Sequence, residues 1–229
     1  MDFLFSLADK IGFAVCHQIP SRTIIIGKVY LPLCGRTSGI YIGFLISAIT
    51  LFIIFRKKEN GLAPLYIIII FCLFIFSTGL DWALSHLGIY ESSNNIRFIT
   101  GFLAGSSIIA ISFPVFNKQY YRISNDLRIF KSSVTSIVYI LILFIFIILT
   151  LLRFSFLSLF YYYLSAFAVL FTFFFTNLFT VLLIPAFANK AERLASKFII
   201  APSIISLVLT FFELFAFFKL KELFLNLWT

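Results

Sequence analysis

Residues Ser38–Phe55 read SGIYIGFLISAITLFIIF, an apolar run without a single charge. A helix needs about 20 mostly apolar residues to cross the hydrocarbon core of a bilayer. The run stops at Arg56-Lys57-Lys58-Glu59-Asn60, a charged cluster that marks a polar boundary. The stretch therefore predicts a transmembrane helix, and it sets the pattern by which the rest of the chain is divided.

Five further apolar runs are long enough to span a membrane. They lie at about Leu62–Leu80, Ile96–Phe116 and Val134–Leu152, within Phe154–Phe187, and at about Phe198–Phe218. The fifth run exceeds one span, which predicts a tilted or projecting helix. Residues 1–15 are too short and too charged to span, and they predict an interfacial or re-entrant helix. The expected fold is an all-α membrane protein with six transmembrane helices, this N-terminal helix and a short hairpin-like segment that contains cysteines.

The composition of the 229 residues supports this fold class. Hydrophobic residues make up 62%, charged residues 12%, and the mean hydropathy is +1.08. Soluble domains average about 45–50% apolar and about 25% charged residues. A water-soluble enzyme, a disordered chain and a small disulfide scaffold are therefore excluded, and we expect a multi-pass protein of the cell membrane, embedded in the lipid bilayer.

The net charge of +9 is best explained by orientation in the membrane. Loops 1–2, 3–4 and 5–6 each carry several Lys and Arg residues, and loops 2–3 and 4–5 carry few. The positive-inside rule places the basic loops in the cytoplasm and both termini outside. The N-terminal segment is also basic and needs another explanation, such as a binding site. No nucleic-acid partner is expected.

The two halves of the chain differ, although we expect one structural domain. All ten glycines, all three cysteines and both histidines precede position 106. Residues 1–116 are therefore interpreted as a motif-bearing half and residues 117–229 as a hydrophobic scaffold. The pairs Gly39-xxx-Gly43 and Gly101-xxx-Gly105 predict that the first and third spanning helices are neighbours, because glycine lets helix backbones approach closely.

The first group of candidate residues surrounds two cysteines. Cys16-His17 precedes the β-prone stretch 24–33, which Gly27-Lys28 interrupts, and this pattern predicts a hairpin that brings Cys16 close to Cys34. Three interpretations stay open: a disulfide, which the outer face allows; a zinc site of Cys16, His17 and Cys34, with its fourth position either open or filled by His86; and unpaired packing cysteines.

The second group lies around the loop between the second and third spans, on the same predicted face. Asp81 and Glu91 are candidate acid/base residues there. The candidate ligand-binding residues are Arg22, Arg36, Asn94 and Arg97. Arginines suit a phosphate or an anionic headgroup, which they bind in bidentate fashion. The alternatives are an interfacial Asp81, a helix cap at Ser93 or Asn94 and a snorkelling Arg97.

Together these blocks resemble domain-of-unknown-function family 2085, small prokaryotic membrane proteins. The resemblance covers about residues 12–105. Its signature residues here are Cys16, His17, Pro20, Arg22, Cys34, Arg36, Gly39, Tyr41, Gly43, Asp81, Glu91, Ser92, Asn94, Arg97, Thr100 and Gly101. Thr37 stands where the family has a second cysteine and Thr23 where serine is usual, and the loss at Thr37 weakens a four-ligand metal site. The resemblance implies a shared site without an activity.

Three functions are compatible with these residues. The first is an outward-facing site that binds or processes an anionic lipid-like or amphipathic ligand, with Asp81 or Glu91 as acid/base if the protein is an enzyme. The second is an assembly or structural role with a membrane protein partner. The third is the substrate-binding subunit of a small-molecule transporter, which the number of helices suggests.

Overall fold

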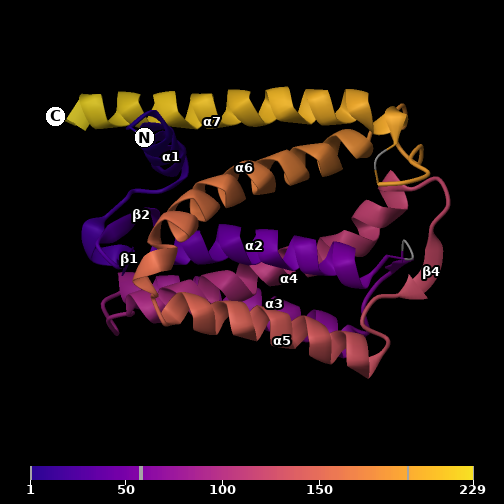
Figure 1. Cartoon of the computed structure of the whole chain (residues 1–229), viewed down its shortest axis with the longest axis horizontal. Helices are drawn as coiled ribbons and strands as arrows, with labels where there is room; N and C mark the ends of the chain where they lie inside the picture. Colours follow the sequence, from indigo (N-terminus) through magenta and orange to yellow (C-terminus); the bar gives the residue numbers. More distant parts are fainter. Residues whose placement is uncertain (1, 57–58, 195, 229) are drawn as a thin grey trace.

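The computed structural model describes residues 2–56, 59–194 and 196–228 (Figure 1). Seven α-helices are found in these residues, and six of them, α2 to α7, are long and apolar enough to cross a membrane. The helices are α1 (Asp2–Val15), α2 (Gly35–Ile54), α3 (Leu65–His86), α4 (Asn94–Tyr120), α5 (Ser133–Leu151), α6 (Ser158–Leu182) and α7 (Ile200–Trp228). The predicted fold class is confirmed.

The strands are short and lie at opposite ends of the molecule. Strands β1 (Thr23–Ile26) and β2 (Val29–Cys34) form an antiparallel hairpin, as predicted. The turn uses Gly27 with φ of +62°, a conformation that glycine adopts without steric cost. Strands β3 (Glu59–Gly61) and β4 (Asn125–Arg128) pair in parallel and join the α2–α3 and α4–α5 connections.

The connections alternate between two ends. The α2–α3, α4–α5 and α6–α7 connections lie at one end, on the right in Figure 1, and we call this the basic end. The β1–β2 hairpin, the 87–93 loop, the α5–α6 turn and both termini lie at the other end, which we call the motif end. This alternation agrees with the predicted topology. Two of the predicted basic residues, Lys57 and Lys58, lie outside the described residues.

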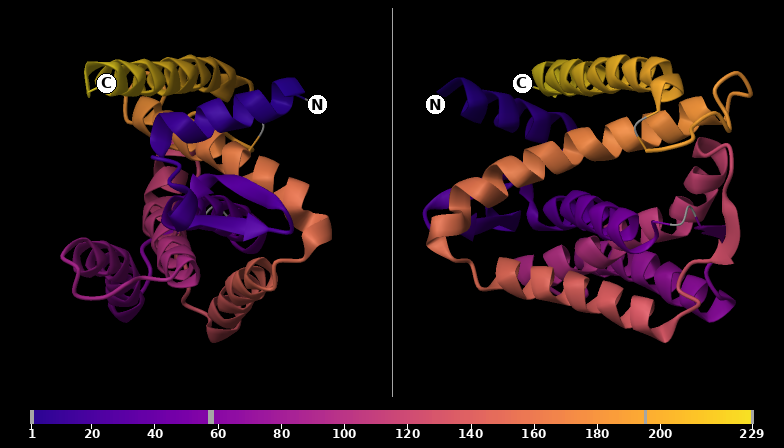
Figure 2. Two further views of the ribbon diagram at one scale, coloured as in Figure 1. Left: turned by 90° about the vertical axis from the view of Figure 1, so that its left-hand side faces the viewer. Right: turned by 45° about the vertical axis from the view of Figure 1, so that its right-hand side comes forward.

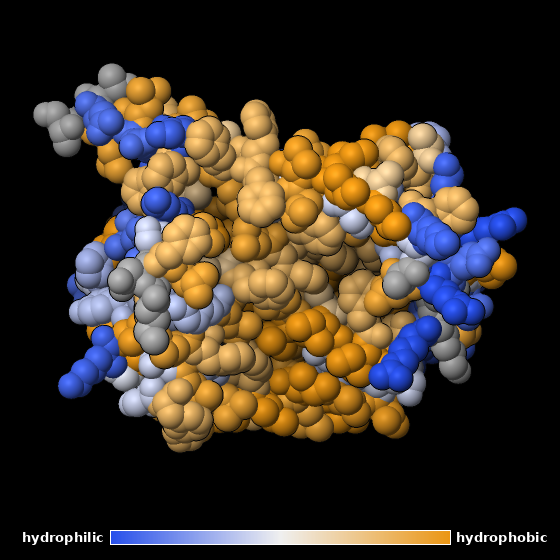
Figure 3. All heavy atoms as spheres, turned by 45° about the horizontal axis from the view of Figure 1, so that its top comes forward, coloured by the Kyte–Doolittle hydropathy of each residue, from blue (hydrophilic) through white to orange (hydrophobic). Residues whose placement is uncertain are grey.

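The surface matches this division. Figure 3 shows an apolar band around the middle of the face in view, with hydrophilic residues gathered at the two ends. Helix α6 crosses obliquely over α2, in agreement with its predicted tilt (Figure 1). It also packs against β2, so the second half of the chain contacts the first. The division at residue 116 stays an interpretation of the sequence.

Two predicted boundaries are wrong: α7 continues past Phe218 to Trp228, and α3 does not end at Leu80. The second span was expected to end at Leu80, with Asp81 at the helix end, but α3 continues through Asp81 to His86. The reason is that the Asp81 carboxylate is paired with Arg36 of α2, so its charge does not force the helix to stop. Asp81 is buried as a result, with 5% of its surface exposed.

Helices α2 and α4 form the most extensive helix pair, through the predicted glycines. A Cβ atom at Gly39 or Gly43 would collide with the backbone of α4 at Phe98 or Phe102. In return, a Cβ at Gly101 would collide with the carbonyl oxygen of Arg36, and Gly105 meets α2 in the same way. We call this contact the glycine seam. The predicted α2–α4 neighbourhood is confirmed.

Substitution of a seam glycine is expected to destabilise the protein. Gly43→Leu or Gly101→Leu should lower the free energy of unfolding by at least about 1–3 kcal/mol, because the added side chain meets backbone that cannot move aside. Denaturant titration in detergent micelles measures this change. Gly79→Leu is the matched control, since no atom lies near its Cβ position on α3. Equal losses at Gly79 and Gly43 would contradict the role of the seam.

Candidate functional site

The motif end gathers most of the predicted residues around Asp81 of α3. The Oδ2 atom of Asp81 accepts a hydrogen bond from Arg36, in the first turn of α2, and forms an ion pair with it. The Oδ1 atom accepts hydrogen bonds from the hydroxyls of Tyr90 and Ser92, the latter at 2.6 Å. The carboxylate raises the pKa of Tyr90, because it accepts the phenol's hydrogen bond. Three elements therefore meet at one carboxylate.

Asn94 joins the start of α4 to the hairpin. Its Nδ2 atom donates to the carbonyl oxygens of Ser21 and Thr23, both at 3.1 Å. Its Oδ1 atom accepts from Nη1 of Arg97 at 3.2 Å. The cap of α4 is Ser93, whose Oγ accepts from a backbone N–H at 3.3 Å. Asn94 is thereby free to position Arg97 against the hairpin.

Positive charge exceeds negative charge in this cluster. Arg97 lies close enough to Arg22, Arg36 and Asp81 to interact electrostatically with each of them. Among the described residues, the Arg97 guanidinium bonds only to Asn94, and the exposed Arg22 guanidinium makes no hydrogen bond or ion pair. The Nε atom of Arg36 is buried without a partner. Three guanidinium groups therefore face one carboxylate, and several N–H donors remain available.

One sequence interpretation differs from this geometry, and two contacts were not predicted. Glu91, predicted to join the cluster, is exposed on the 87–93 loop and makes no ion pair with a described residue. Tyr90 was not selected from the sequence, although it lies beside Glu91-Ser92. Arg153, in the turn after α5, donates to Asn95 at the start of α4, and the sequence carries no signal for that pairing.

The cysteine pair was predicted to be close, and it is. The backbone N–H of Cys34 donates to Sγ of Cys16 at 3.2 Å, so the two cysteines are in direct contact. The Cys34 thiol, followed by the backbone N–H groups of Cys34 and Gln18, lowers the pKa of Cys16 to about 5. The neighbouring Cys16 sulfur in turn raises the pKa of Cys34. Both are free thiols.

The zinc interpretation gains no support from the geometry. Nowhere in the described ranges do three His, Cys, Asp or Glu side chains gather as a metal site. His17 is exposed beside the thiol pair, and His86 stacks on Trp82 with ring centroids 5.5 Å apart. Thr37 instead contacts Sγ of Cys34 through its hydroxyl at 3.0 Å, in the position where a further metal-binding cysteine would stand.

Six helices able to cross a bilayer, with connections that alternate between two ends, define a multi-pass membrane protein. A family model described as "Predicted membrane protein (DUF2085)" matches residues 16–111, from the first cysteine into α4. The chain belongs to this family, as its sequence motifs indicated. The matched residues include the thiol pair, the hairpin and the Asp81 cluster.

Two archaeal relatives agree with this assignment. An "uncharacterized protein MJ1492" of Methanocaldococcus jannaschii is 32% identical over 110 residues, which are 47% of this chain and 67% of the relative. An "uncharacterized protein" of Methanothermobacter thermautotrophicus is 31% identical over 98 residues, 43% of this chain and 84% of the relative. No solved structure matches the chain.

The ion pair provides a stability test. Asp81→Asn should lower the free energy of unfolding by about 3 kcal/mol, because it leaves Arg36 partly buried without a counter-charge. Glu222→Gln is the control: it breaks an exposed pair with Lys219 and should cost less than about 1 kcal/mol. Adding Arg36→Met to Asp81→Asn should recover part of the loss. Equal small effects at both sites would refute a structural role for the Asp81 pair.

Proposed function

We propose that the motif end binds the anionic group of a lipid-like or amphipathic molecule. Arg22, Arg36 and Arg97 supply the N–H donors, and Asn94 positions Arg97. The observation that carries the proposal is the imbalance of three guanidinium groups over one carboxylate. Charge at the edge of the hydrocarbon region is costly unless it is paired or used. A purely structural network would be fully paired within the protein.

Asp81 has a positioning role in this proposal. Its Oδ2 is engaged by Arg36 and its Oδ1 by two hydroxyls. A general base needs a free lone pair within reach of the proton that it removes. We therefore assign Asp81 to holding Arg36 and the 87–93 loop in place, and we propose binding rather than acid/base chemistry at this carboxylate.

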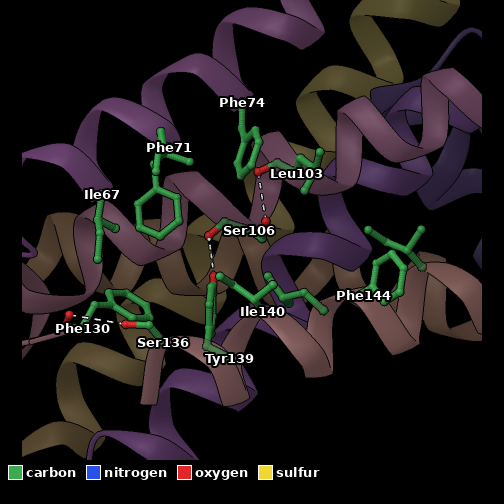
Figure 4. A pocket seen from close by; sticks show the side chains of 13 residues that line it. Ile67, Phe71, Phe74, Leu103, Ser106, Phe130, Ser136, Tyr139, Ile140 and Phe144 are labelled. Carbon is green, nitrogen blue, oxygen red and sulfur yellow. Dashed lines mark hydrogen bonds between the residues drawn. The ribbon is translucent and has the colours of Figure 1, made fainter. Parts of the chain in front are cut away.

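The amphipathic character of the ligand is inferred from a nearby cavity. An apolar cavity of about 210 Å³ lies between α3, α4 and α5 (Figure 4). Phe74 of α3 and Leu103 of α4 line its side towards the motif end, and Phe130 and Ser136 line its side towards the basic end. Helices α3 and α4 also carry Asp81 and Arg97. Asp81 follows Phe74 by seven positions, and Leu103 follows Arg97 by six. The charged residues are therefore roughly 10 Å along the helix axes from the nearest lining residues of the cavity. That is a suitable reach for a molecule with a charged head and an apolar tail.

The cavity is suited to hydrocarbon. It exceeds the roughly 150 Å³ of an apolar cavity that binds benzene. Its polar groups are already bonded: Oγ of Ser106 donates to Leu103 O at 2.9 Å, and the Tyr139 hydroxyl lies 2.7 Å from Oγ of Ser47. Because both hydroxyls are already bonded within the protein, neither attracts water into the cavity in preference to an alkyl chain. This supports a lipid-like ligand over a soluble anion.

The headgroup prediction is tested with defined lipids. Purified protein in nanodiscs should gain thermal stability when phosphatidylglycerol replaces phosphatidylcholine, because its phosphodiester has no choline cation to offset the charge that the arginines bind. Arg97→Gln should remove most of this gain. Arg128→Gln at the basic end is the matched control, since it removes one exposed charge from β4 and should keep the gain. A gain that survives Arg97→Gln, or that is lost equally in both variants, would contradict the site.

The tail prediction uses the cavity. Ile140→Trp should fill the space between α3 and α5 and reduce binding of long-chain phosphatidylglycerol by about tenfold, while binding of glycerol phosphate, which has no tail, should be unchanged. Native mass spectrometry counts the bound molecules. Ile184→Trp, an exposed substitution beyond α6, serves as the control. Loss of glycerol phosphate binding in Ile140→Trp would show that the cavity does not act separately.

A further inference from the structure

The loop after α1 and the end of β2 bring Cys16 and Cys34 into contact. Cys16 follows α1, and its loop is tied to β2 by Gln18, whose Nε2 donates to Pro32 O at 3.0 Å. Cys34 ends β2 and is the N-cap residue of α2. A helix N-terminus favours negative charge nearby. The positions of both cysteines are therefore fixed by backbone elements, namely the hairpin and the start of α2.

The thiols have the arrangement of a nucleophile and a proton donor. The Cys16 sulfur accepts a hydrogen bond from the backbone N–H of Cys34, which stabilises the Cys16 thiolate. The Cys34 thiol contacts the hydroxyl of Thr37 at 3.0 Å. The other titratable or charged groups that face the pair are Tyr41 of α2, Arg97 of α4 and Lys221 of α7, with His17 next in the chain. Lys221 interacts electrostatically with Cys16 and Arg97 with Cys34.

A groove between α1 and α7 reaches the pair at Cys16, which is 5% exposed; Cys34 does not line this groove. The groove has a volume of about 440 Å³, and Cys16 and His17 contribute to its lining. The remaining lining is largely apolar, with Phe217, Leu220 and Phe224 of α7. Lys221 crosses from α7 and donates to the carbonyl oxygens of Phe13 and Cys16. This groove is better suited to a substrate disulfide flanked by apolar groups than to one flanked by charged groups.

We propose that Cys16 and Cys34 form a redox-active pair that cycles between dithiol and disulfide by exchange with the disulfide of a substrate. This site is separate from the anion site and does not depend on it. The Cys16 thiolate attacks one substrate sulfur, forming a mixed disulfide and breaking the substrate S–S bond. The released substrate sulfur leaves as a thiolate.

The Cys34 sulfur completes the exchange. The Cys34 thiol gives its proton to the released thiolate, and Cys34 then attacks Sγ of Cys16. The Cys16–Cys34 bond forms, the mixed disulfide breaks, and the second substrate sulfur leaves as a thiolate. The substrate disulfide gains two electrons and the cysteine pair loses two. The same steps in reverse oxidise a substrate dithiol.

The test uses the full chain in detergent with Cys72→Ala, which removes the exposed cysteine of α3. Equilibration with mixtures of reduced and oxidised glutathione should give one two-electron transition, in which the mass falls by two hydrogens. Cys34→Ser in this background should accumulate one glutathionyl group on Cys16. Cys16→Ser should accumulate at least tenfold less on Cys34, because its thiol is the resolving partner.

A second probe identifies the source of the disulfide. A peptide with an internal disulfide and apolar flanking residues is compared with oxidised glutathione: faster oxidation by the peptide assigns a polypeptide substrate, and faster oxidation by glutathione assigns a small disulfide. If the folded pair stays reduced with both probes and reacts only in denaturant, it is a structural thiol pair and the proposal fails. Equal adducts on Cys16 and Cys34 would also overturn it.

Discussion

The close contact of the α2 and α4 backbones is the constraint on which the motif end depends. Arg36 lies one turn before Gly39, and Arg97 lies one turn before Gly101, so the glycine seam that joins the helices also sets the separation of these two arginines. Any side chain larger than hydrogen in the seam would push them apart. Cys34, the last residue of the hairpin strand β2, is also the N-cap of the seam helix α2. Packing and candidate chemistry are therefore set by the same four glycines.

Asp81 extends this order to a third helix. Helix α3 is largely exposed to lipid and packs mainly on α4. Its carboxylate reaches over to Arg36 of α2 and also holds the 87–93 loop through Tyr90 and Ser92. Hydrophobic burial orients a helix weakly inside a bilayer, since lipid is as apolar as the protein. The Arg36–Asp81 ion pair can therefore fix the rotation of α3, which apolar contacts with lipid and protein do not determine.

The sequence predicts those features that follow from local patterns. Apolar run lengths predicted the six spans, Gly27-Lys28 predicted the hairpin, and the glycine spacing predicted the α2–α4 pair. Features that depend on a distant partner were not predictable. The end of α3 was misplaced because a lone Asp81 looks like a polar boundary until Arg36 neutralises it. Glu91 and Tyr90 are adjacent in the chain, yet only the direction of a loop decides which of them meets Asp81.

The Lys221 bonds have a consequence for biogenesis. The ammonium group of α7 closes on the carbonyl oxygens of Phe13 and Cys16, and the Phe13 contact joins residues 208 positions apart. During synthesis, α1 and the cysteine loop emerge first, while their partner enters the membrane with the last helix. The cysteine loop is therefore completed only after nearly the whole chain is inserted, and contacts of such long sequence separation form slowly. Until then the two thiols are exposed to whatever oxidants and chaperones surround the nascent protein.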